Sequence, residues 1–269
     1  MVTQECVGLL AGGTPFLAVG EGPPLVHVLP LQPTHEVPTG IDRRRNLSMA
    51  APWRGDFRVY VVNRKQGLQP GESMSDIAGH LATAIEADVG EPVFLSGTST
   101  GGSVALQLAV DRPDLVRTLV VIASACRLGP RGRQIQQELA GRTRAGDAAG
   151  AWADLLAALL PAAVQGPISP VLRGAFRAMK PWDPADMLVT LDAEDVFDVG
   201  DQLHRITAPT LVIGGAKDVG YTRELFEQTA TGVKDGRAYI YPDWGHLRAA
   251  ASSTTANLAL GFHLAARSM

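Results

Sequence analysis

The sequence predicts an α/β fold in which a mostly parallel central sheet is covered by helices on both faces. Short apolar strand candidates alternate with amphipathic helix candidates over most of the 269 residues. Because parallel strands need a long crossover connection, this alternation favours parallel pairing. The composition, 46% hydrophobic and 19% charged, is ordinary for a globular chain that buries one large core.

The first thirty residues contain three strand candidates. They run from Glu5 to Leu10, from Pro15 to Val19 and from Leu25 to Leu29. Gly12-Gly13 and the run Glu21-Gly22-Pro23-Pro24 lie between them and supply the residues that turns require. We therefore expect the chain to open with closely connected strands.

From residue 41 the pattern changes to alternating helices and strands. Apolar side chains spaced by three or four residues indicate helices, and short apolar runs indicate buried strands. The expected elements are, in order, a helix over Ile41 to Ala51, a strand over Arg58 to Val62, a helix over Ser75 to Ala87, a strand over Val93 to Leu95, a helix over Gly102 to Val110 and a strand within Leu115 to Ala125.

The alternation stops between residues 127 and 203. This segment contains alanine-rich helical stretches such as Ala148 to Leu160, and we expect prolines to interrupt them, namely Pro161, Pro167, Pro170, Pro181 and Pro184. We interpret residues 127–203 as a helical insertion that divides a core made of residues 1–126 and 204–269. The core then resumes with a strand over Pro209 to Gly214, a helix over Thr222 to Thr231, a strand over Arg237 to Tyr241 and a helix over Thr254 to Ala266.

Charge and hydropathy argue against several classes of partner. The net charge of −3 provides no field that would attract nucleic acid or an anionic membrane. The first residues lack the pattern of a secretory signal, and no apolar run approaches the roughly 20 residues that span a bilayer. We expect a cytoplasmic protein. Cys6 and Cys126 are too few for a disulfide framework, and we expect both to be reduced and buried.

The pentapeptide Gly97-Thr98-Ser99-Thr100-Gly101 lies between a strand candidate and a helix candidate. Ser99 would therefore lie on a sharp turn that lifts its hydroxyl clear of the sheet, and the flanking glycines leave room for that turn and for a substrate. The N–H of Thr100, at the start of the helix, points into the same space. The motif predicts a nucleophilic Ser99 with Thr100 as one donor to an oxyanion.

His246 is the candidate base that Ser99 needs, since an alcohol is a poor nucleophile near neutral pH. It follows the last strand candidate within Asp243-Trp244-Gly245-His246, in what we expect to be a loop. The carboxyl ends of parallel strands meet at one edge of the sheet, so this loop can reach Ser99. The alternative is a loop histidine without a role.

Asp218 is the candidate acid, because it follows the strand expected over Pro209 to Gly214. Its carboxylate could accept the Nδ1–H of His246, fix the tautomer and stabilise the imidazolium. The alternative is that Asp218 only caps the helix that starts near Thr222. Asp243 is a rival acid, but it would share the loop of His246 rather than face it.

The order of Ser99, Asp218 and His246 resembles that of the α/β-hydrolase fold family, and the resemblance covers almost the whole chain. It implies that the pentapeptide is a nucleophile elbow and that residues 127–203 form a helical cap over the active site. A serine nucleophile favours attack on a carbonyl and an acyl-enzyme. The resemblance implies a serine hydrolase of carboxylic esters, lactones or other small acyl compounds, without cofactor or metal.

The chain departs from the family pattern in two places. Relatives often carry a His-Gly pair where this sequence reads His27-Val28-Leu29-Pro30-Leu31. Because Pro30 has no N–H, we expect Leu31 to be the second oxyanion donor, with Leu29 as the alternative. The loop Asn63-Arg64-Lys65-Gln66-Gly67 also differs from the family's usual sequence, and we assign it no function.

Several polar and apolar residues have two readings each. We expect His27 and His35 to make local hydrogen bonds, with substrate contact as the alternative. The acidic residues between 192 and 201 are expected to form a solvated edge rather than a cation site. The large apolar residues of the insertion either line a pocket or form its own core: Met179, Trp182, Met187 and Phe197.

The sequence therefore predicts an ester hydrolase that acts through Ser99 on a small-molecule acyl substrate. The same residues would serve a thioesterase, a carbon–carbon bond hydrolase, a perhydrolase or an acyltransferase, and fold resemblance does not choose among them. A non-catalytic receptor for a small ligand is the alternative from a different functional class. No sequence pattern indicates an oligomeric state.

Overall fold

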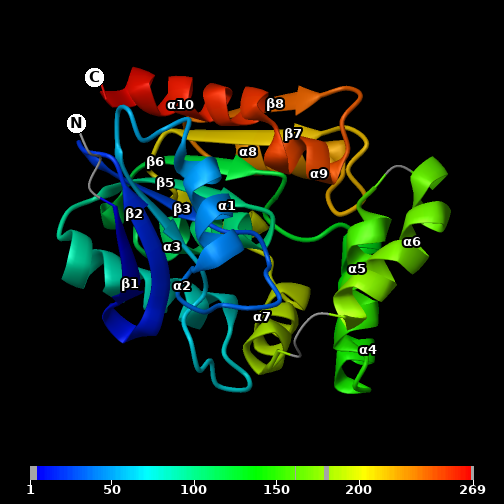
Figure 1. The fold of residues 1–269 in the computed structure, drawn as a ribbon. Coiled ribbons are helices and arrows are strands. Elements are labelled where there is room, and N and C mark those ends of the chain that lie inside the picture. The colour runs from blue at the N-terminus through cyan, green and yellow to red at the C-terminus, as the bar shows by residue number, and fades with distance from the viewer. Residues whose placement is uncertain (1–4, 161, 179–181, 268–269) are drawn as a thin grey trace.

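The computed structural model describes residues 5–160, 162–178 and 182–267. Within these residues the chain forms an eight-stranded sheet with helices on both faces, which confirms the predicted fold class (Figure 1). The strands are β1 (Cys6–Leu10), β2 (Thr14–Val19), β3 (Pro24–Val28), β4 (Arg58–Val62), β5 (Val93–Thr98), β6 (Val116–Ile122), β7 (Thr210–Gly215) and β8 (Gly236–Tyr241).

The strand order in the sheet is β1-β2-β4-β3-β5-β6-β7-β8. The strands β1 and β2 form a hairpin, and β2 pairs with β4 in the antiparallel sense. All pairs from β4–β3 to β7–β8 are parallel. The carboxyl ends of the parallel strands consequently meet at one edge of the sheet, the edge that carries the residues after β3, β5, β7 and β8.

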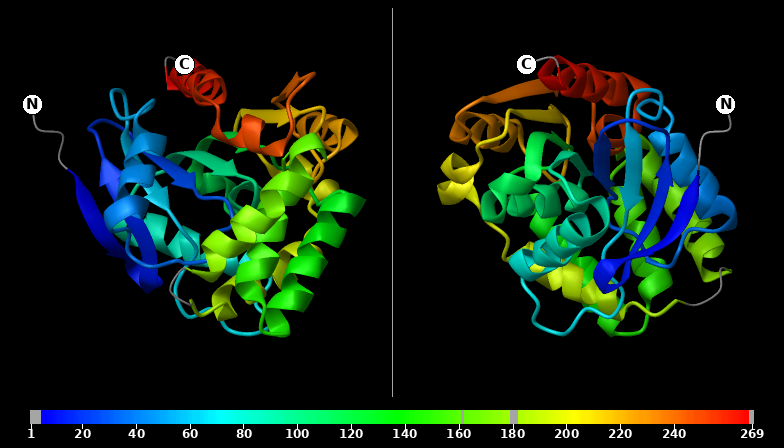
Figure 2. Two further views of the ribbon diagram at one scale, coloured as in Figure 1. Left: turned by 45° about the vertical axis from the view of Figure 1, so that its right-hand side comes forward. Right: turned by 90° about the vertical axis from the view of Figure 1, so that its left-hand side faces the viewer.

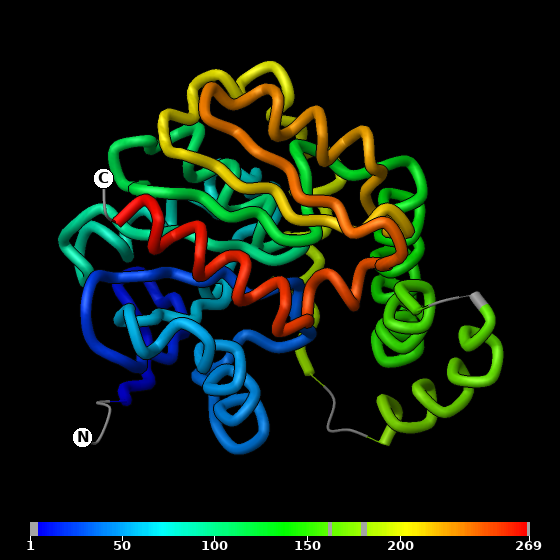
Figure 3. The backbone as a smooth tube through the Cα atoms, turned by 90° about the horizontal axis from the view of Figure 1, so that it is seen from above, coloured from blue at the N-terminus to red at the C-terminus, as the bar shows by residue number. Residues whose placement is uncertain are grey.

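Helices cover both faces and bury two apolar layers. One face carries α2 (Met74–Ala84), α3 (Thr100–Asp111) and α8 (Arg223–Gly232), and the other carries α1 (Gly40–Ala50) and α10 (Ser253–Arg267). Figure 3 shows α10 running across the sheet. Strand residues that face the two layers alternate along each strand, as the pleat of a sheet requires.

In the described part of the segment between β6 and β7, the chain forms four α-helices and a short 3₁₀ helix (Gly200–Arg205). The α-helices are α4 (Pro130–Arg144), α5 (Ala148–Ala158), α6 (Ala162–Arg177) and α7 (Ala185–Asp195). Figures 1 and 2 show α4, α5 and α6 beside the carboxyl ends of the parallel strands. These helices thus stand at the edge of the sheet to which Ser99 belongs.

The expectation that Pro167 and Pro170 interrupt a helix is wrong, because both lie inside α6. A proline in a helix interior removes a backbone hydrogen bond. Here α6 packs against α5, and Asp154 of α5 accepts hydrogen bonds from Ser169 (3.0 Å) and Arg173 (2.7 Å) of α6. These tertiary contacts offset the loss. Pro184 does precede α7, whereas Pro161 and Pro181 lie outside the described residues.

The two cysteines differ in their surroundings. Both thiols are free and Cys126 is buried, as expected, but Cys6 lies exposed on the edge strand β1, so the prediction of its burial is wrong. An edge strand has a neighbour on one side only, which leaves more of its side chains in contact with water. No helix among the described residues is long and apolar enough to cross a bilayer.

Candidate active site

Ser99 occupies a strained turn between β5 and α3. Its backbone has φ 53° and ψ −125°, a combination that residues other than glycine rarely adopt. Helix α3 starts at the next residue. The N–H of Ser99 donates to the carbonyl of Ile122 at the end of β6 (2.8 Å). The sheet therefore holds the turn in place, and strain of this kind is common at active sites.

Three glycines around Ser99 permit the close approach of α3 to the sheet. A Cβ on Gly97 would lie 2.1 Å from the carbonyl oxygen of Gly101, and one on Gly101 would lie 2.3 Å from that of Val28. A Cβ on Gly102 would lie 2.5 Å from the side chain of Ser124. The sequence motif indicated the first two glycines, whereas the requirement at Gly102 depends on packing against the segment after β6.

Ser99, His246 and Asp218 come together at the carboxyl edge of the sheet. Ser99 Oγ lies 3.0 Å from His246 Nε2, and His246 Nδ1 lies 2.8 Å from Asp218 Oδ2. The His246 side chain is 6% exposed and that of Asp218 is fully buried. His246 is the first residue of α9 (His246–Ala251), so the prediction that it lies in a loop is wrong. The helix starts directly after Gly245, whose carbonyl accepts from Ala249 N.

The carboxylate of Asp218 is held from two sides. Its Oδ1 accepts the backbone N–H groups of Gly220 (2.7 Å) and Tyr221 (3.2 Å), while Oδ2 faces His246. The alternative reading of Asp218 as a helix cap does not apply, because Thr222 is the N-cap of α8. Asp243 is turned to Lys217, whose Nζ lies 2.8 Å from its carboxylate on the surface.

A buried carboxylate, Glu194 of α7, lies against the start of α3. It accepts hydrogen bonds from Thr100 (2.7 Å), Ser103 (2.7 Å), Gln136 (2.8 Å) and Tyr221 (3.4 Å), and the residue is 0% exposed. The expectation of a solvated acidic edge is therefore wrong for Glu194. Its partners come from three different segments, and no spacing in the sequence predicts that these segments lie together.

Tyr221 connects Glu194 to His246. Its ring stacks on the imidazole of His246, with centroids 6.2 Å apart and planes at 17°. Burial and the charge of Glu194 raise the pKa of the Tyr221 hydroxyl well above 10, so the group stays neutral. It can then donate to Glu194 while its ring limits the movement of His246.

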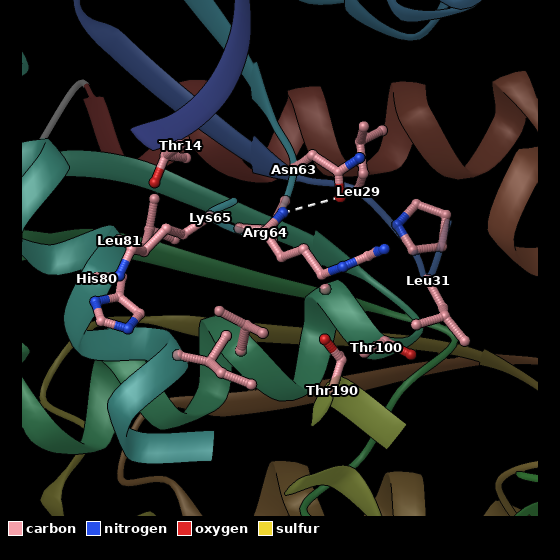
Figure 4. Close-up of a pocket in the computed structure, with 15 residues that line it drawn as sticks. Thr14, Leu29, Leu31, Asn63, Arg64, Lys65, His80, Leu81, Thr100 and Thr190 are labelled. Carbon is pink, nitrogen blue, oxygen red and sulfur yellow. Dashed lines mark hydrogen bonds between the residues drawn. The ribbon is translucent and has the colours of Figure 1, made fainter. Parts of the chain in front are cut away.

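The loop of residues 29–36, which follows β3, is held by the segment after β4. Arg64 Nη1 donates to the carbonyl of Gln32 (2.9 Å), and Asn63 Nδ2 donates to that of Thr34 (3.1 Å). Figure 4 shows Arg64 extending from the end of β4 toward Leu31. Burial lowers the pKa of Arg64 to about 10, which still leaves it charged near neutral pH. Only the fold brings the segment after β4 to the 29–36 loop, so no local pattern in the sequence indicates this role.

His35 and His27 differ in their hydrogen bonding. His35 Nε2 lies 2.6 Å from Asp186 of α7 and its Nδ1 lies 3.3 Å from Arg64, as expected for local bonding. Burial, with the nearby Arg64 charge, lowers the pKa of His35. His27 makes no hydrogen bond with any described residue, so the expectation of local bonding is wrong for it.

A cavity of about 1050 Å³ opens beside Ser99 and His246. Core residues and residues of the insertion line it, and most of the lining from the insertion is apolar: Leu128, Ile135, Trp152, Leu155, Leu156, Leu159, Phe176 and Trp182. Of the other apolar residues of the insertion, Met187 packs with Leu139 and Leu191, and Phe197 joins the main core. Met179 lies outside the described residues.

A second, much smaller cavity of about 30 Å³ lies behind the 29–36 loop. Leu29, Leu31, Arg64, Thr100 and Thr190 are among its lining residues (Figure 4). Its size is that of a gap between packed elements, whereas the larger cavity has room for a substrate. Within the described part of the chain, no group of three or more His, Cys, Asp or Glu side chains could hold a metal ion.

The sequence matches a known family over most of its length. The family model described as "Alpha/beta hydrolase family" matches residues 39–256, which is most of the chain. The chain belongs to the alpha/beta hydrolase family. The resemblance inferred from the serine motif and the order of the three residues is thereby confirmed.

Similar proteins cover from about two thirds to nearly all of this alpha/beta hydrolase family member. "Putative carbamate hydrolase RutD" of Variovorax paradoxus is 28% identical over 198 residues, which are 72% of this chain and 73% of that protein. A hydrolase structure from Pseudomonas aeruginosa has a TM-score of 0.76 at 20% identity, covering 98% of this chain and 99% of its own. A thermophilic esterase from Thermogutta terrifontis has a TM-score of 0.70 at 21% identity, covering 98% of both chains.

Proposed function

We propose that this alpha/beta hydrolase family member is a serine hydrolase that cleaves carboxylic esters, lactones or other small acyl compounds. The observation that carries the proposal is the chain of contacts from Ser99 Oγ to His246 Nε2 (3.0 Å) and from His246 Nδ1 to Asp218 (2.8 Å). Both distances are within hydrogen-bond reach, as transfer of the Ser99 proton to His246 requires. The buried Asp218 carboxylate can accept the Nδ1–H of His246, and this hydrogen bond holds one tautomer of the imidazole.

In the proposed reaction Ser99 Oγ attacks the substrate carbonyl while His246 Nε2 accepts the hydroxyl proton. Asp218 stabilises the imidazolium through the Nδ1–H. His246 then gives its proton to the leaving alcohol, and an acyl-enzyme remains on Ser99. Water attacks this ester with His246 again as base, which releases the acid and restores Ser99.

The oxyanion would be bound by the N–H groups of Thr100 and Leu31. Leu29, the alternative donor, gives its N–H to the carbonyl of Val62 (3.0 Å), and Pro30 has none, which supports Leu31. Both Leu31 and Thr100 line the large cavity beside Ser99. Each donor of this kind lowers the barrier by about 3 kcal/mol in serine hydrolases.

Residues 127–203 would act as the cap that completes the pocket, on a core formed by residues 1–126 and 204–269. The apolar residues that the insertion places around the cavity support this division. Such a lining favours neutral acyl and alcohol groups over charged ones, since burying an unpaired charge is costly.

Carbamates form a second substrate class. They are carbonyl compounds open to the same attack, and the similarity to the RutD protein supports testing them beside esters. Thioester cleavage, carbon–carbon bond cleavage, perhydrolysis and acyl transfer would use the same three residues, and a receptor would keep the cavity without turnover.

The test is the hydrolysis of short-chain aryl esters, aryl carbamates and lactones by the purified protein. We expect Ser99→Ala and His246→Ala to lower kcat by about three orders of magnitude or more, and Asp218→Asn to lower it strongly. A fluorophosphonate should label Ser99 alone. The surface variant Asp243→Asn is the control. Equal turnover by the wild type, Ser99→Ala and His246→Ala would sink the serine mechanism.

A further inference from the structure

Two buried polar side chains that line the cavity of Ser99 have no hydrogen-bond partner among the described residues. His27 on β3 is 1% exposed and Thr98 on β5 is 2% exposed. Both line the large cavity, yet Nδ1 and Nε2 of His27 and Oγ1 of Thr98 make no hydrogen bond with a described residue. Buried polar groups are almost always hydrogen-bonded, and a molecule bound in the cavity that both residues line could supply the partner.

The two side chains face the same side of the sheet. Because β3 and β5 are parallel neighbours and His27 lies opposite Ser96, Thr98 stands two residues further along on the face of Ser96. Thr98 is also the residue directly before Ser99. The two side chains therefore line the same cavity as Ser99, from neighbouring strands on one face of the sheet.

A comparison within the same sheet face shows that the fold can satisfy such groups. His263 of α10, also fully buried, lies 2.8 Å from Ser96 Oγ through Nε2 and 2.7 Å from Thr118 Oγ1 through Nδ1. His27 instead packs on the ring of Trp53, with centroids 4.9 Å apart. The indole N–H of Trp53 is given to Ala256, so Trp53 offers His27 no polar contact.

The His27 imidazole and the Thr98 hydroxyl are both neutral near pH 7. Burial lowers the pKa of His27 to about 4, so near pH 7 its ring presents one N–H donor and one acceptor. The Thr98 hydroxyl can donate or accept. Among the described lining residues the charged ones are Asp42 and Arg45, which pair with each other at 3.2 Å. The wall thus offers hydrogen bonds without a free charge.

We propose that His27 and Thr98 form a polar subsite that recognises a neutral hydrogen-bonding group of the substrate, such as a ketone, a hydroxyl or an amide. This inference rests on the proposed acyl hydrolase function and specifies its substrate class. The substrate is a neutral ester or related acyl compound with a second oxygen- or nitrogen-bearing group, positioned to reach the end of β3 and β5. A site built around such bonds discriminates against a substrate that leaves them unmade.

The test compares straight-chain aryl esters with esters of equal length in which one methylene is replaced by a ketone. One series carries the ketone in the acyl part and a second carries it in the alcohol part. We expect the wild type to prefer the ketone ester in one series by about tenfold or more in kcat/KM. His27→Leu and Thr98→Val should each reduce this preference toward one, and His27→Gln, which keeps a donor and an acceptor, should retain part of it.

Thr231→Val is the matched control, since Thr231 lies exposed on α8 and this variant should keep the wild-type preference. Thr98→Val preserves the β-branched shape and serves if His27→Leu fails to fold. Turnover with equal preference in wild type, His27→Leu and Thr98→Val, as expected if the groups bind only water, would overturn the subsite alone. Absence of both turnover and Ser99 labelling in the wild type would instead overturn the proposed function together with the subsite.

Discussion

At the scale of single residues, the elbow depends on the absence of side chains as much as on Ser99. Ser99 has a positive φ. At the glycines around it, Gly97, Gly101 and Gly102, neighbouring atoms come so close that a Cβ would have no room. Gly101 lies against two carbonyl oxygens at the end of β3, those of Val28 and Leu29. Because backbone atoms of a central strand cannot shift far, this contact sets where α3 begins relative to the 29–36 loop.

Gly101→Ala is therefore expected to destabilise the protein by about 1–3 kcal/mol or more and to reduce kcat, since it displaces Thr100 from the 29–36 loop. The clash would be with oxygens only 2.3 and 2.4 Å from the new Cβ. Thermal unfolding and ester turnover measure the two effects. Gly141→Ala is the control, because a Cβ there meets open space in α4 and should stabilise by up to about 1 kcal/mol. Unchanged stability and turnover in Gly101→Ala would contradict this account.

At the scale of elements, Glu194 ties α7 to the start of α3. Its carboxylate accepts from Thr100 and Ser103 of α3, from Gln136 of α4 and from Tyr221 after β7. Thr100 also supplies the proposed oxyanion donor. Movement of α7 would therefore be felt at the turn that carries Ser99.

Glu194→Ala should lower the free energy of unfolding by about 3 kcal/mol, because it leaves buried hydroxyl and amide groups without their acceptor. We also expect a lower kcat, with Glu194→Gln in between, since an amide oxygen can still accept from Thr100. Chemical denaturation and ester kinetics provide the two readouts. Asp192→Ala, which removes an exposed carboxylate of α7 that pairs with Arg144 of α4, should change stability by about 0.5 kcal/mol at most. Equal effects of the Glu194→Ala and Asp192→Ala substitutions would refute the role of Glu194 as a link.

At the scale of the whole molecule, burial against the sheet keeps two histidines, His27 and His263, neutral near pH 7. Burial lowers the pKa of His27 to about 4 and that of His263 to about 3. Unfolding exposes both, so between pH 6.5 and about 4 the unfolded chain binds more protons than the folded one. Their contribution to stability is complete above pH 6.5 and is lost as the pH falls.

We expect the free energy of unfolding to fall by up to about 1.4 kcal/mol per pH unit for each of these histidines below pH 6.5. Urea unfolding measured at pH 7, 6 and 5 gives the slope. His263→Gln, which removes one titrating group, should flatten it, whereas replacement of His80, whose side chain is 30% exposed, should leave it steeper than in His263→Gln. The same slope in wild type and His263→Gln would show that this histidine does not drive acid unfolding.

Much of the core was predictable because its signals are local. The strand expected over Arg58 to Val62 is β4, and the strand–turn–helix around Ser99 follows from apolar runs and glycines within fifteen residues. The insertion was less predictable. Pro167 and Pro170 oppose a helix locally, but packing of α6 on α5 decides otherwise. Likewise, the acidic residues between 192 and 201 are typical of a solvated edge, yet Glu194 is buried because residues of other elements donate hydrogen bonds to it.

The sequence by itself determined the fold class and the identity of Ser99, Asp218 and His246 as candidates, because parallel strands bring the ends that carry them to one edge. It also excluded Pro30 as an oxyanion donor, since that is a property of the residue alone. Only the tertiary structure decided that Leu29 N–H donates to Val62 and that Arg64 holds the 29–36 loop. It also decided that His27 and Thr98 line the cavity without a hydrogen-bond partner among the described residues. Hydrogen bonding between residues distant in sequence depends on packing, and no local pattern encodes it.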